Sequence, residues 1–477
     1  MMNCLTIFRG FRLCQRQVWR FTLAWLLGSL LLSCSTSRPT ADLAPVADIA
    51  AEATPDPFSR GYTLAELQAD FKELQSRIEL THPKLYADRT AVAALLETNY
   101  GRLAEGMTEL DLLRLLAPIV SRLNCGHTAL SLSAAYQERL ASVGRYFPLL
   151  LRFLGGKAYI SGNSLYPAIP LGAELLSIND QSMADIVAVL FASMSADGFN
   201  QTGKFAQLNG WFRYKYQNII DDQGDYDITW RTDAAGPIQS AHLAGAGNAT
   251  IAQAHQAFFD SWNASHDRPF EADFQAGYAR LIMRSFYPEG NHSLPRYKSF
   301  IDDFFTRVQA EAVGTVILDV RGNSGGDPYV TAHLFSFLAE TAQPYFADSA
   351  PGYYPSLKRT VPLAAKRFGG RLLVLMDGAS FSSTGHLLAL LRSQSVGSFI
   401  GEESGGSFVC TDGSQDYRLC HSGLQFRSST IVWEVATAGL EPGRGIMPDH
   451  PVQPSIADWL AGRDTVLDYA VRLAGQP

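Results

Sequence analysis

The second half of this chain repeats one pattern, an apolar run of strand length followed by a glycine-containing loop. The runs are Val313–Val320, Arg371–Asp377 and Val396–Ile400, and a helical pattern follows each of the first two loops. Strands that alternate with helices predict a mostly parallel sheet, because parallel neighbours need a crossover connection. Ligands bind at the carboxyl ends of such strands, so we expect a functional site in these loops.

The first part of the chain has a helical period instead. Apolar residues recur every three or four positions between Leu64 and Ile78, and two further helices are predicted near Thr90–Glu105 and Glu109–Leu123. Residues 144–235 then contain short strands around a Gly155-Gly156 turn and a helix from Met183. This order resembles the second half of a PDZ domain, and a generic α+β insert is the alternative.

The amino terminus reads as an export signal. Four arginines precede an apolar run, Phe21–Leu32, which is too short for a membrane span of about 20 residues and ends in Leu-Leu-Ser-Cys. This ending resembles the lipobox of bacterial lipoproteins, which implies a lipid on Cys34; an ordinary signal peptide with a chance cysteine is the alternative. Because Ser35 follows Cys34, the resemblance implies the outer membrane, facing the periplasm, of a Gram-negative cell envelope.

Charge and cysteine content limit which partners, disulfides and cofactors we expect. Removal of residues 1–33 takes away four arginines and no acids, so the net charge changes from −7 to −11, which argues against nucleic acid as a partner. In an oxidising periplasm we expect a disulfide between Cys410 and Cys420, with two free thiols as the alternative. No Cys/His spacing indicates a metal site, and we expect neither a metal nor an organic cofactor.

Two loops carry candidate chemistry. Ser382 opens a predicted helix after the strand that ends at Asp377, so its hydroxyl either caps that helix or acts as a nucleophile beside free helix-terminal amides. The loop after Val320 holds three glycines within five residues, which lets the amides of Gly325 and Gly326 approach an oxyanion. A tight structural turn is the alternative for that loop.

The sequence here resembles the C-terminal processing (tail-specific) serine peptidases, whose relatives include the tricorn core peptidase and the interphotoreceptor retinoid-binding protein. Five segments in order carry the resemblance: CGHT at 125–128, ILDVRGNSGG at 317–326, VLMDGASFSS at 374–383, GEESGG at 401–406 and GIMPDHPV at 445–452. It implies an α/β, multi-domain α+β chain with a crotonase/ClpP-like core and a mostly parallel sheet. The predicted parts are signal 1–33, tether 34–60, N-terminal helical domain 61–135, PDZ-like domain 143–235 and peptidase domain 250–475.

Alignment to the family distinguishes the two serines of the turn. The family places a Gly-Glu pair nineteen residues after the nucleophile, which is Gly401 counted from Ser382 but Phe399 counted from Ser380. The resemblance therefore implies Ser382 as the nucleophile, with the amide of Ser383 as a further oxyanion donor. Two positions depart from the family pattern: Phe381 replaces a small residue and Gly385 replaces a glutamate.

A serine needs a base to take its proton. The family's usual lysine falls on Ser407, and no lysine follows Lys366, so a Ser/Lys dyad is excluded. The tricorn-like branch uses an earlier histidine, which implies His127 as the base. His386, one helical turn after Ser382, is the rival.

A histidine base needs an acceptor that fixes its tautomer. By resemblance, Glu441 is the candidate, with Glu402 and Glu434 as alternatives, and Asp449 is read as structural.

These residues predict a membrane-anchored serine peptidase that acts on peptide or protein substrates through an acyl-enzyme. Two other classes stay open. One is a catalytically silent binding lipoprotein on the same fold, and the other is an esterase or crotonase-like acyl-CoA enzyme, against which the export signal argues.

Overall fold

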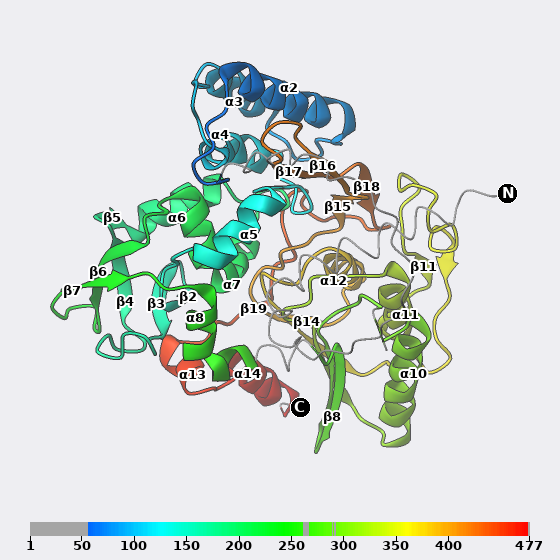
Figure 1. The fold of residues 1–477 in the computed structure, drawn as a ribbon. Helices are drawn as coiled ribbons and strands as arrows, with labels where there is room; N and C mark the ends of the chain where they lie inside the picture. The colour runs from blue at the N-terminus through cyan, green and yellow to red at the C-terminus, as the bar shows by residue number, and fades with distance from the viewer. Residues whose placement is uncertain (1–55, 261–266, 289, 291, 476–477) are drawn as a thin grey trace, which may run out of the picture. The chain divides into compact units, whose positions relative to one another are not determined.

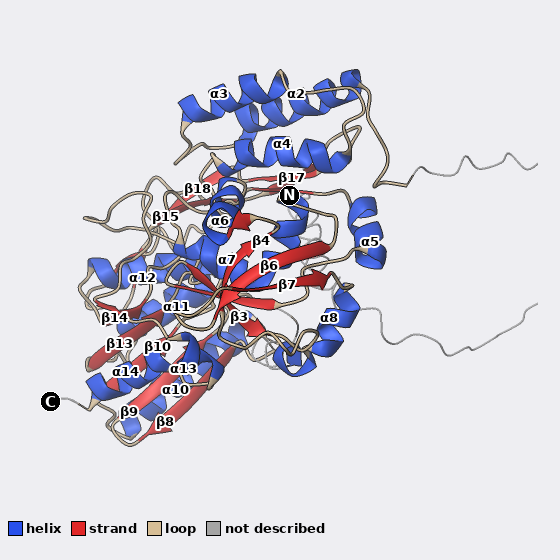
Figure 2. Ribbon diagram, turned by 90° about the vertical axis from the view of Figure 1, so that its left-hand side faces the viewer, coloured by secondary structure: helices blue, strands red, loops and turns tan. Residues whose placement is uncertain are grey.

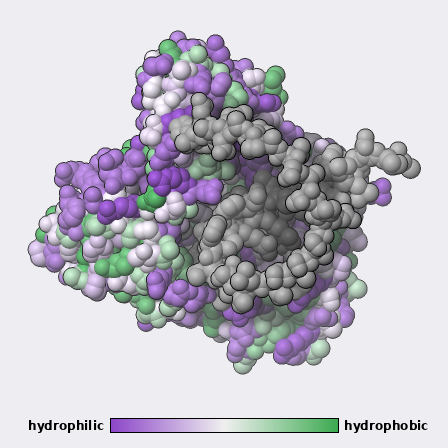
Figure 3. All heavy atoms as spheres, in the orientation of Figure 1, coloured by the Kyte–Doolittle hydropathy of each residue, from purple (hydrophilic) through white to green (hydrophobic). Residues whose placement is uncertain are grey.

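A computed structural model of the chain describes residues 56–260, 267–288, 290 and 292–475. The predicted signal, Cys34 and nearly all of the predicted tether fall outside these residues. Within the described ranges, no helix is both long and apolar enough to cross a bilayer. On the face drawn in Figure 3, the visible hydrophilic and hydrophobic residues are interspersed.

The helices predicted near the start of the chain are present. They are α2 (Leu64–Thr81), α3 (Arg89–Tyr100) and α4 (Glu109–Ser121), followed by β1 (Ala129–Ser131) and α5 (Ala134–Val143). Capping boxes formed by Thr63 with Glu66, and by Thr108 with Asp111, explain where α2 and α4 begin. In Figure 1 α2, α3 and α4 lie above β16 (Gln415–Arg418) and β17 (Gln425–Ser428), and β1 pairs antiparallel with β17.

The middle of the chain forms its own antiparallel sheet, in the order β2-β3-β4-β6-β7 with β5 paired to β4. Its strands are β2 (Leu150–Leu154), β3 (Lys157–Gly162), β4 (Glu174–Ile178), β5 (Gln181–Ser182), β6 (Asp225–Arg231) and β7 (Gln239–Ala244). Its helices are α6 (Met183–Ala192), α7 (Thr202–Ile219) and α8 (Asn248–Ala254). Helix α7 packs along the edge strand β2, where the Phe153 amide donates to Asn209 Oδ1 at 2.7 Å.

The second half of the chain forms the predicted mostly parallel sheet, at the lower left of Figure 2. Its order is β19-β14-β13-β10-β9-β8, and only the β8–β9 pair is antiparallel. The strands are β8 (Phe270–Gln275), β9 (Tyr278–Met283), β10 (Thr315–Asp319), β13 (Arg371–Met376), β14 (Ser398–Gly401) and β19 (His450–Pro451). The predicted fold class, mixed α/β with this core, is confirmed.

Helices cover both faces of this sheet because its strands are apolar on both sides. Val316 and Leu318 of β10 face a core shared with α10 (Leu294–Ala310), α11 (Pro328–Leu338) and α12 (Ser383–Ser393). Ile317, between them, faces α14 (Thr465–Ala474), which follows the short α13 (Ile456–Leu460). Two small antiparallel pairs complete the strands, β11 (Gln343–Pro344) with β12 (Thr360–Val361) and β15 (Val409–Asp412) with β18 (Ile431–Glu434).

The predicted Cys410–Cys420 disulfide is wrong, because both thiols are free. Cys410 is buried in β15, which pairs with β18, and its Sγ lies 3.4 Å from His386 Nε2. Cys420 is exposed after β16, which pairs with β17, and its Sγ lies 3.3 Å from Asp70 Oδ1. The segment between the cysteines thus changes from one strand pair to another, which sends the two side chains to different surroundings.

Candidate active site

Ser382 stands at a sharp turn between β13 and α12. Its backbone has φ 55° and ψ −127°, a left-handed conformation that costs a residue with a side chain of the order of 1–3 kcal/mol. It occupies the N-cap position of α12, yet its side chain makes no capping hydrogen bond. The hydroxyl is therefore available for another partner.

That partner is His127. Its Nε2 lies 3.1 Å from Ser382 Oγ, although 255 positions separate the two residues in sequence. His127 sits in the turn between α4 and β1, and pairing of β1 with β17 holds this turn against the second half of the chain. Both residues are partly exposed, so a substrate can reach them. A hydroxyl and an imidazole in this arrangement are a nucleophile and a general base.

Phe381, one of the two departures from the family pattern, packs on the histidine. Its ring centroid lies 4.6 Å from that of His127, with 32° between the ring planes. The same ring fills the space beside Gly126, where an added Cβ would come within 2.6 Å of it. Phe381 and Gly126 together therefore define where the imidazole lies.

Gly385, the other departure from the family pattern, is explained by the backbone that packs against it. A Cβ at this position would come within 2.5 Å of the Gly406 carbonyl carbon and 2.6 Å of the Ser407 amide nitrogen. The start of α12 lies directly against the 401–406 loop, so the space that a glutamate would need is filled by backbone. Ser407, at the family's lysine position, is buried, and none of the described residues forms a hydrogen bond with its Oγ.

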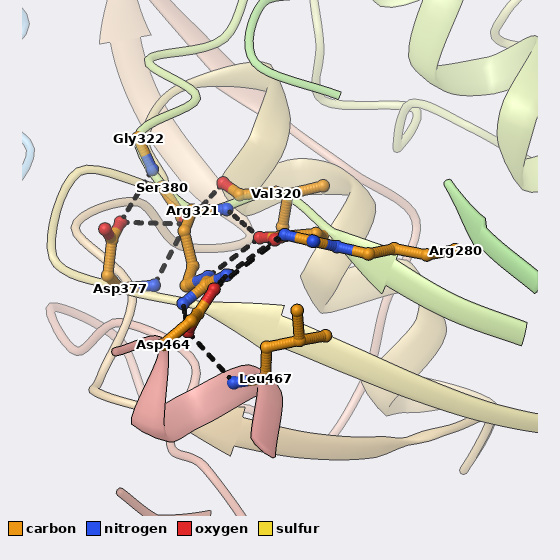
Figure 4. Close-up of polar contacts among 9 residues, drawn as sticks. Arg280, Val320, Arg321, Gly322, Asp377, Ser380, Asp464 and Leu467 are labelled. Carbon is orange, nitrogen blue, oxygen red and sulfur yellow. Dashed lines mark hydrogen bonds and ion pairs between the residues drawn. The ribbon is translucent and has the colours of Figure 1, made fainter. Parts of the chain in front are cut away.

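Ser380 is a structural residue. It is fully buried, its Oγ donates to the Val320 carbonyl at 2.9 Å, and it accepts from the Asp377 amide at 3.2 Å. These bonds join the turn that carries Ser382 to Val320, which follows strand β10 at the start of the glycine-rich loop (Figure 4). Of the two serines that the sequence offered, only Ser382 contacts His127.

A buried cluster of ion pairs holds the start of the glycine-rich loop that follows β10. Asp319, at the end of β10, accepts from Arg321 and Arg280, and Arg321 also pairs with Asp464 at 2.7 Å (Figure 4). Burial by itself raises the pKa of Asp319, but the two guanidinium groups outweigh it and hold that pKa well below its ordinary value. The loop thus starts from a buried base that is held by several ion pairs.

The glycine loop then passes over Ser382. A Cβ on Gly325 would come within 2.7 Å of Ser382 Cβ, so only glycine permits this approach. The Gly325 amide donates to Asn323 Oδ1 at 2.9 Å, whereas no acceptor among the described residues takes the amides of Gly326 or Ser383. Of the three predicted oxyanion donors, these two are free to bind an incoming oxygen.

His386, the rival base, is directed elsewhere. It is buried and its Nε2 faces Cys410 Sγ at 3.4 Å. Burial, together with the neighbouring His127, lowers the pKa of His386 to about 3. Its imidazole stays neutral at physiological pH, and the hydrogen bond of His386 to Ser382 is the backbone one, from the His386 amide to the Ser382 carbonyl at 3.1 Å.

The predicted acidic partners do not contact His127. Glu441 is exposed, Glu402 bonds with Gln453, and Glu434 accepts from Ser349 Oγ at 2.7 Å. Asp449 pairs with Arg392 and accepts from the Phe399 amide, which agrees with its reading as structural.

Two other aspartates lie beside the histidine, and no sequence motif marked either of them. Asp412 Oδ2 is 3.9 Å from Nε2, and its side chain is 38% exposed. Asp197 is 4% exposed, and its Oδ1 accepts from the Gly126 amide at 2.7 Å. Burial raises the pKa of Asp197 to about 6, and the neighbouring His127 lowers it in part.

A cavity of about 480 Å³ lies between the segment that contains the antiparallel sheet, β2 to β7, and the segment that contains the mostly parallel sheet. The β2–β3 turn (Gly155 and Gly156) lines one side, and Glu402, Glu403 and Arg444 line another. Because Glu403 and Glu402 continue the loop that packs on α12, this cavity adjoins the segment that supports Ser382.

Residues 278–452 match the family model of peptidase family S41. A comparison with curated protein sequences gives no match. Among solved structures, mature CPAF complexed with lactacystin is similar at 12% identity and a TM-score of 0.60, over 86% of this chain and 98% of that chain. Mature CPAF alone has 12% identity and a TM-score of 0.61, over 86% and 96%. The photosystem II D1 C-terminal processing protease has 14% identity and a TM-score of 0.43, over 86% and 97%.

Proposed function

We propose that this chain hydrolyses peptide bonds through an acyl-enzyme on Ser382, with His127 as the base. The match of residues 278–452 to the model of peptidase family S41 supports a peptidase activity. The 3.1 Å contact between His127 Nε2 and Ser382 Oγ carries this proposal. The strained turn and the absence of a capping bond support it, since both leave the hydroxyl directed at the imidazole.

The proposed reaction moves one proton at each stage. His127 Nε2 takes the Ser382 proton as Oγ attacks the carbonyl carbon, and the free amides of Gly326 and Ser383 receive the developing oxyanion. Protonated His127 then gives its proton to the leaving amine, and the peptide C–N bond breaks. In the second half, His127 takes a proton from water as the water oxygen attacks the acyl ester, and it then gives that proton to Ser382 Oγ as the ester C–O bond breaks.

Labelling with a fluorophosphonate probe tests the nucleophile. We expect the wild type to label, Ser382→Ala not to label, and Ser380→Ala to label if it folds, because Ser380 faces Val320 rather than His127. Lactacystin is a second probe, because CPAF of similar fold is known with it bound. Equal labelling of wild type and Ser382→Ala would refute the assignment.

The same preparation distinguishes the other classes. Cleavage of a peptide library with a labelled Ser382 supports the peptidase. Turnover of short acyl esters without any peptide cleavage would instead indicate an esterase. Peptide binding with no labelling at all would indicate a silent binding protein on this fold.

We also propose peptide or protein segments as substrates, with the PDZ-like insert as a binding module. Strand addition at its β2 edge would have to displace the Asn209 side chain, which already accepts the Phe153 amide. An Asn209→Ala variant is expected to change KM for long peptides more than KM for short ones. Equal KM changes for both would count against binding at this edge.

Export and lipid anchoring at Cys34, with a location in the outer membrane facing the periplasm, are part of the same proposal. They are supported by the amino-terminal sequence, in which basic residues precede an apolar run that ends in Leu-Leu-Ser-Cys. Labelling of cells with an alkyne fatty acid is expected to mark the wild type but not Cys34→Ser. Equal incorporation into both would exclude this anchor.

A further inference from the structure

Two buried polar atoms beside the proposed catalytic pair have no hydrogen-bond partner among the residues that the structure describes. They are His127 Nδ1, the ring nitrogen that does not face Ser382, and Asp197 Oδ2. Buried polar atoms are nearly always satisfied, by protein groups or by water. The two atoms belong to neighbouring side chains, and His127 lowers the pKa of Asp197 in part.

The backbone holds these side chains next to each other. Asp197 Oδ1 accepts from the amide of Gly126, the residue directly before His127, at 2.7 Å. The Gly198 amide donates to the Asn124 carbonyl at 2.9 Å, so the two segments are tied at two points. Asp197 is thereby fixed against the turn that carries the histidine.

The same segment is tied to the loop that packs on α12. Asn200 Nδ2 donates to the Ser404 carbonyl at 2.8 Å, and Thr202 Oγ1 donates to the Glu403 carbonyl at 2.8 Å. Residues 197–202 therefore connect the turn of the histidine with the loop beside the serine helix. A carboxylate on this connection is held rigidly relative to both.

We propose that Asp197 is the residue that positions His127, by accepting the Nδ1 proton at Oδ2 through one bridging water. This inference rests on the proposed function, since it needs His127 to act as a base. With the proton on Nδ1, the lone pair of Nε2 points at Ser382 Oγ, which is the tautomer that a general base requires.

The other acids near the site fit this role less well. Asp412 approaches Nε2, the nitrogen that already faces Ser382, and it is 38% exposed. Glu441, expected from the resemblance, is exposed and shares no hydrogen bond or ion pair with His127. Asp197 is the carboxylate that combines burial, an unpartnered oxygen and a direct bond to the histidine's own turn.

An Asp197→Asn variant tests the role with little change in shape. The amide oxygen can still accept from Gly126, while the charge and the second acceptor are lost. We expect kcat to fall by about 10²–10⁴-fold with KM within roughly threefold of wild type, because Asp197 does not touch substrate. Asp70→Asn, another buried aspartate that accepts backbone amides, is the matched control and is expected to keep kcat.

The pH profile separates positioning from a merely structural role. Loss of a negative charge beside the imidazole disfavours its protonated form, so the acid limb of kcat/KM is expected to move to lower pH in Asp197→Asn. The charged and titratable groups that act on Asp197 or lie around it are His127, Asp412, Tyr86, Cys125 and Cys410, and the variant leaves all five in place. An acid limb that does not move would overturn the inference.

If Asp197→Asn fails to fold, the wild type itself still gives an answer. Nitrogen-15 spectra of histidine-labelled protein report which ring nitrogen of His127 carries the proton, and His127→Gln assigns the signal. A proton on Nδ1 is expected, and a proton on Nε2 in the free enzyme would refute the role of Asp197. Absence of fluorophosphonate labelling in the wild type would refute the proposed function instead, so the two failures are distinct.

Discussion

The ring of Phe381 packs on the imidazole of His127, with 4.6 Å between their centroids, and so joins the turn of the serine to the turn of the histidine. Within the described residues, no backbone hydrogen bond joins Phe381 to His127. Phe381, one of the two departures from the family pattern, thus packs directly on the imidazole of the proposed base.

Removal of this contact is expected to loosen the base. Phe381→Ala should lower kcat/KM by about tenfold or more, because a small displacement of a catalytic group is costly, while Phe381→Leu should lose less. Rates of fluorophosphonate labelling for both variants measure the effect. Equal rates for Phe381→Ala and wild type would show that the ring plays no part in holding the imidazole.

Restoring the family's glutamate at Gly385 is expected to damage the protein. The Cβ alone would meet the backbone of Gly406 and Ser407 at 2.5–2.6 Å, so α12 and the 401–406 loop must separate. We expect Gly385→Ala to lower stability by about 1–3 kcal/mol and Gly385→Glu to lower it further. Thermal unfolding measures both, with Ser393→Ala, on the last turn of the same helix, as the control. A Gly385→Glu protein as stable as wild type would contradict this packing.

Asp319 makes stability depend on acid pH. Its pKa in the folded state lies below the ordinary value of 3.8, so its contribution is complete above that value and is lost as pH falls toward the folded pKa. Asp319→Asn leaves two buried arginines without the carboxylate charge that they share and is expected to cost roughly 3–5 kcal/mol at neutral pH. Unfolding of both proteins from pH 7 to pH 2 should show the gap between them narrowing, and a constant gap would argue against this ionic role.

The three described cysteines are expected to differ in accessibility rather than to form a bridge. Cys420 should label in the native protein, whereas Cys125 and Cys410 should label only after unfolding. Burial and the neighbouring carboxylates of Asp70 and Glu73 raise the pKa of Cys420 to about 11, so labelling should accelerate with pH and in Glu73→Gln. Mass spectrometry without reductant checks this, and a Cys410–Cys420 cross-linked peptide would contradict it.

Local patterns were sufficient for much of the fold. The periods of Leu64–Ile78 and of the apolar runs around Ile317 and Leu373 predicted helices and parallel strands, because burial of one face or of both leaves a repeat in the sequence. The distance from Ser382 to Gly401 distinguished the nucleophile candidate from Ser380, and the structure brings that serine to His127. These are relations along one stretch of chain, or motifs with fixed spacing.

Only the tertiary structure decided the surroundings of the pair. Asp197 lies in no motif, and it lies beside the turn that carries His127 because the segment after α6 is tied to the turn after α4, which sequence spacing does not encode. The predicted disulfide was wrong for the same reason. Cys410 and Cys420 are near each other in sequence, but their segments belong to different strand pairs. Sequence records which residues are buried and which loops are tight, whereas contacts across many residues depend on how the strands pair and pack.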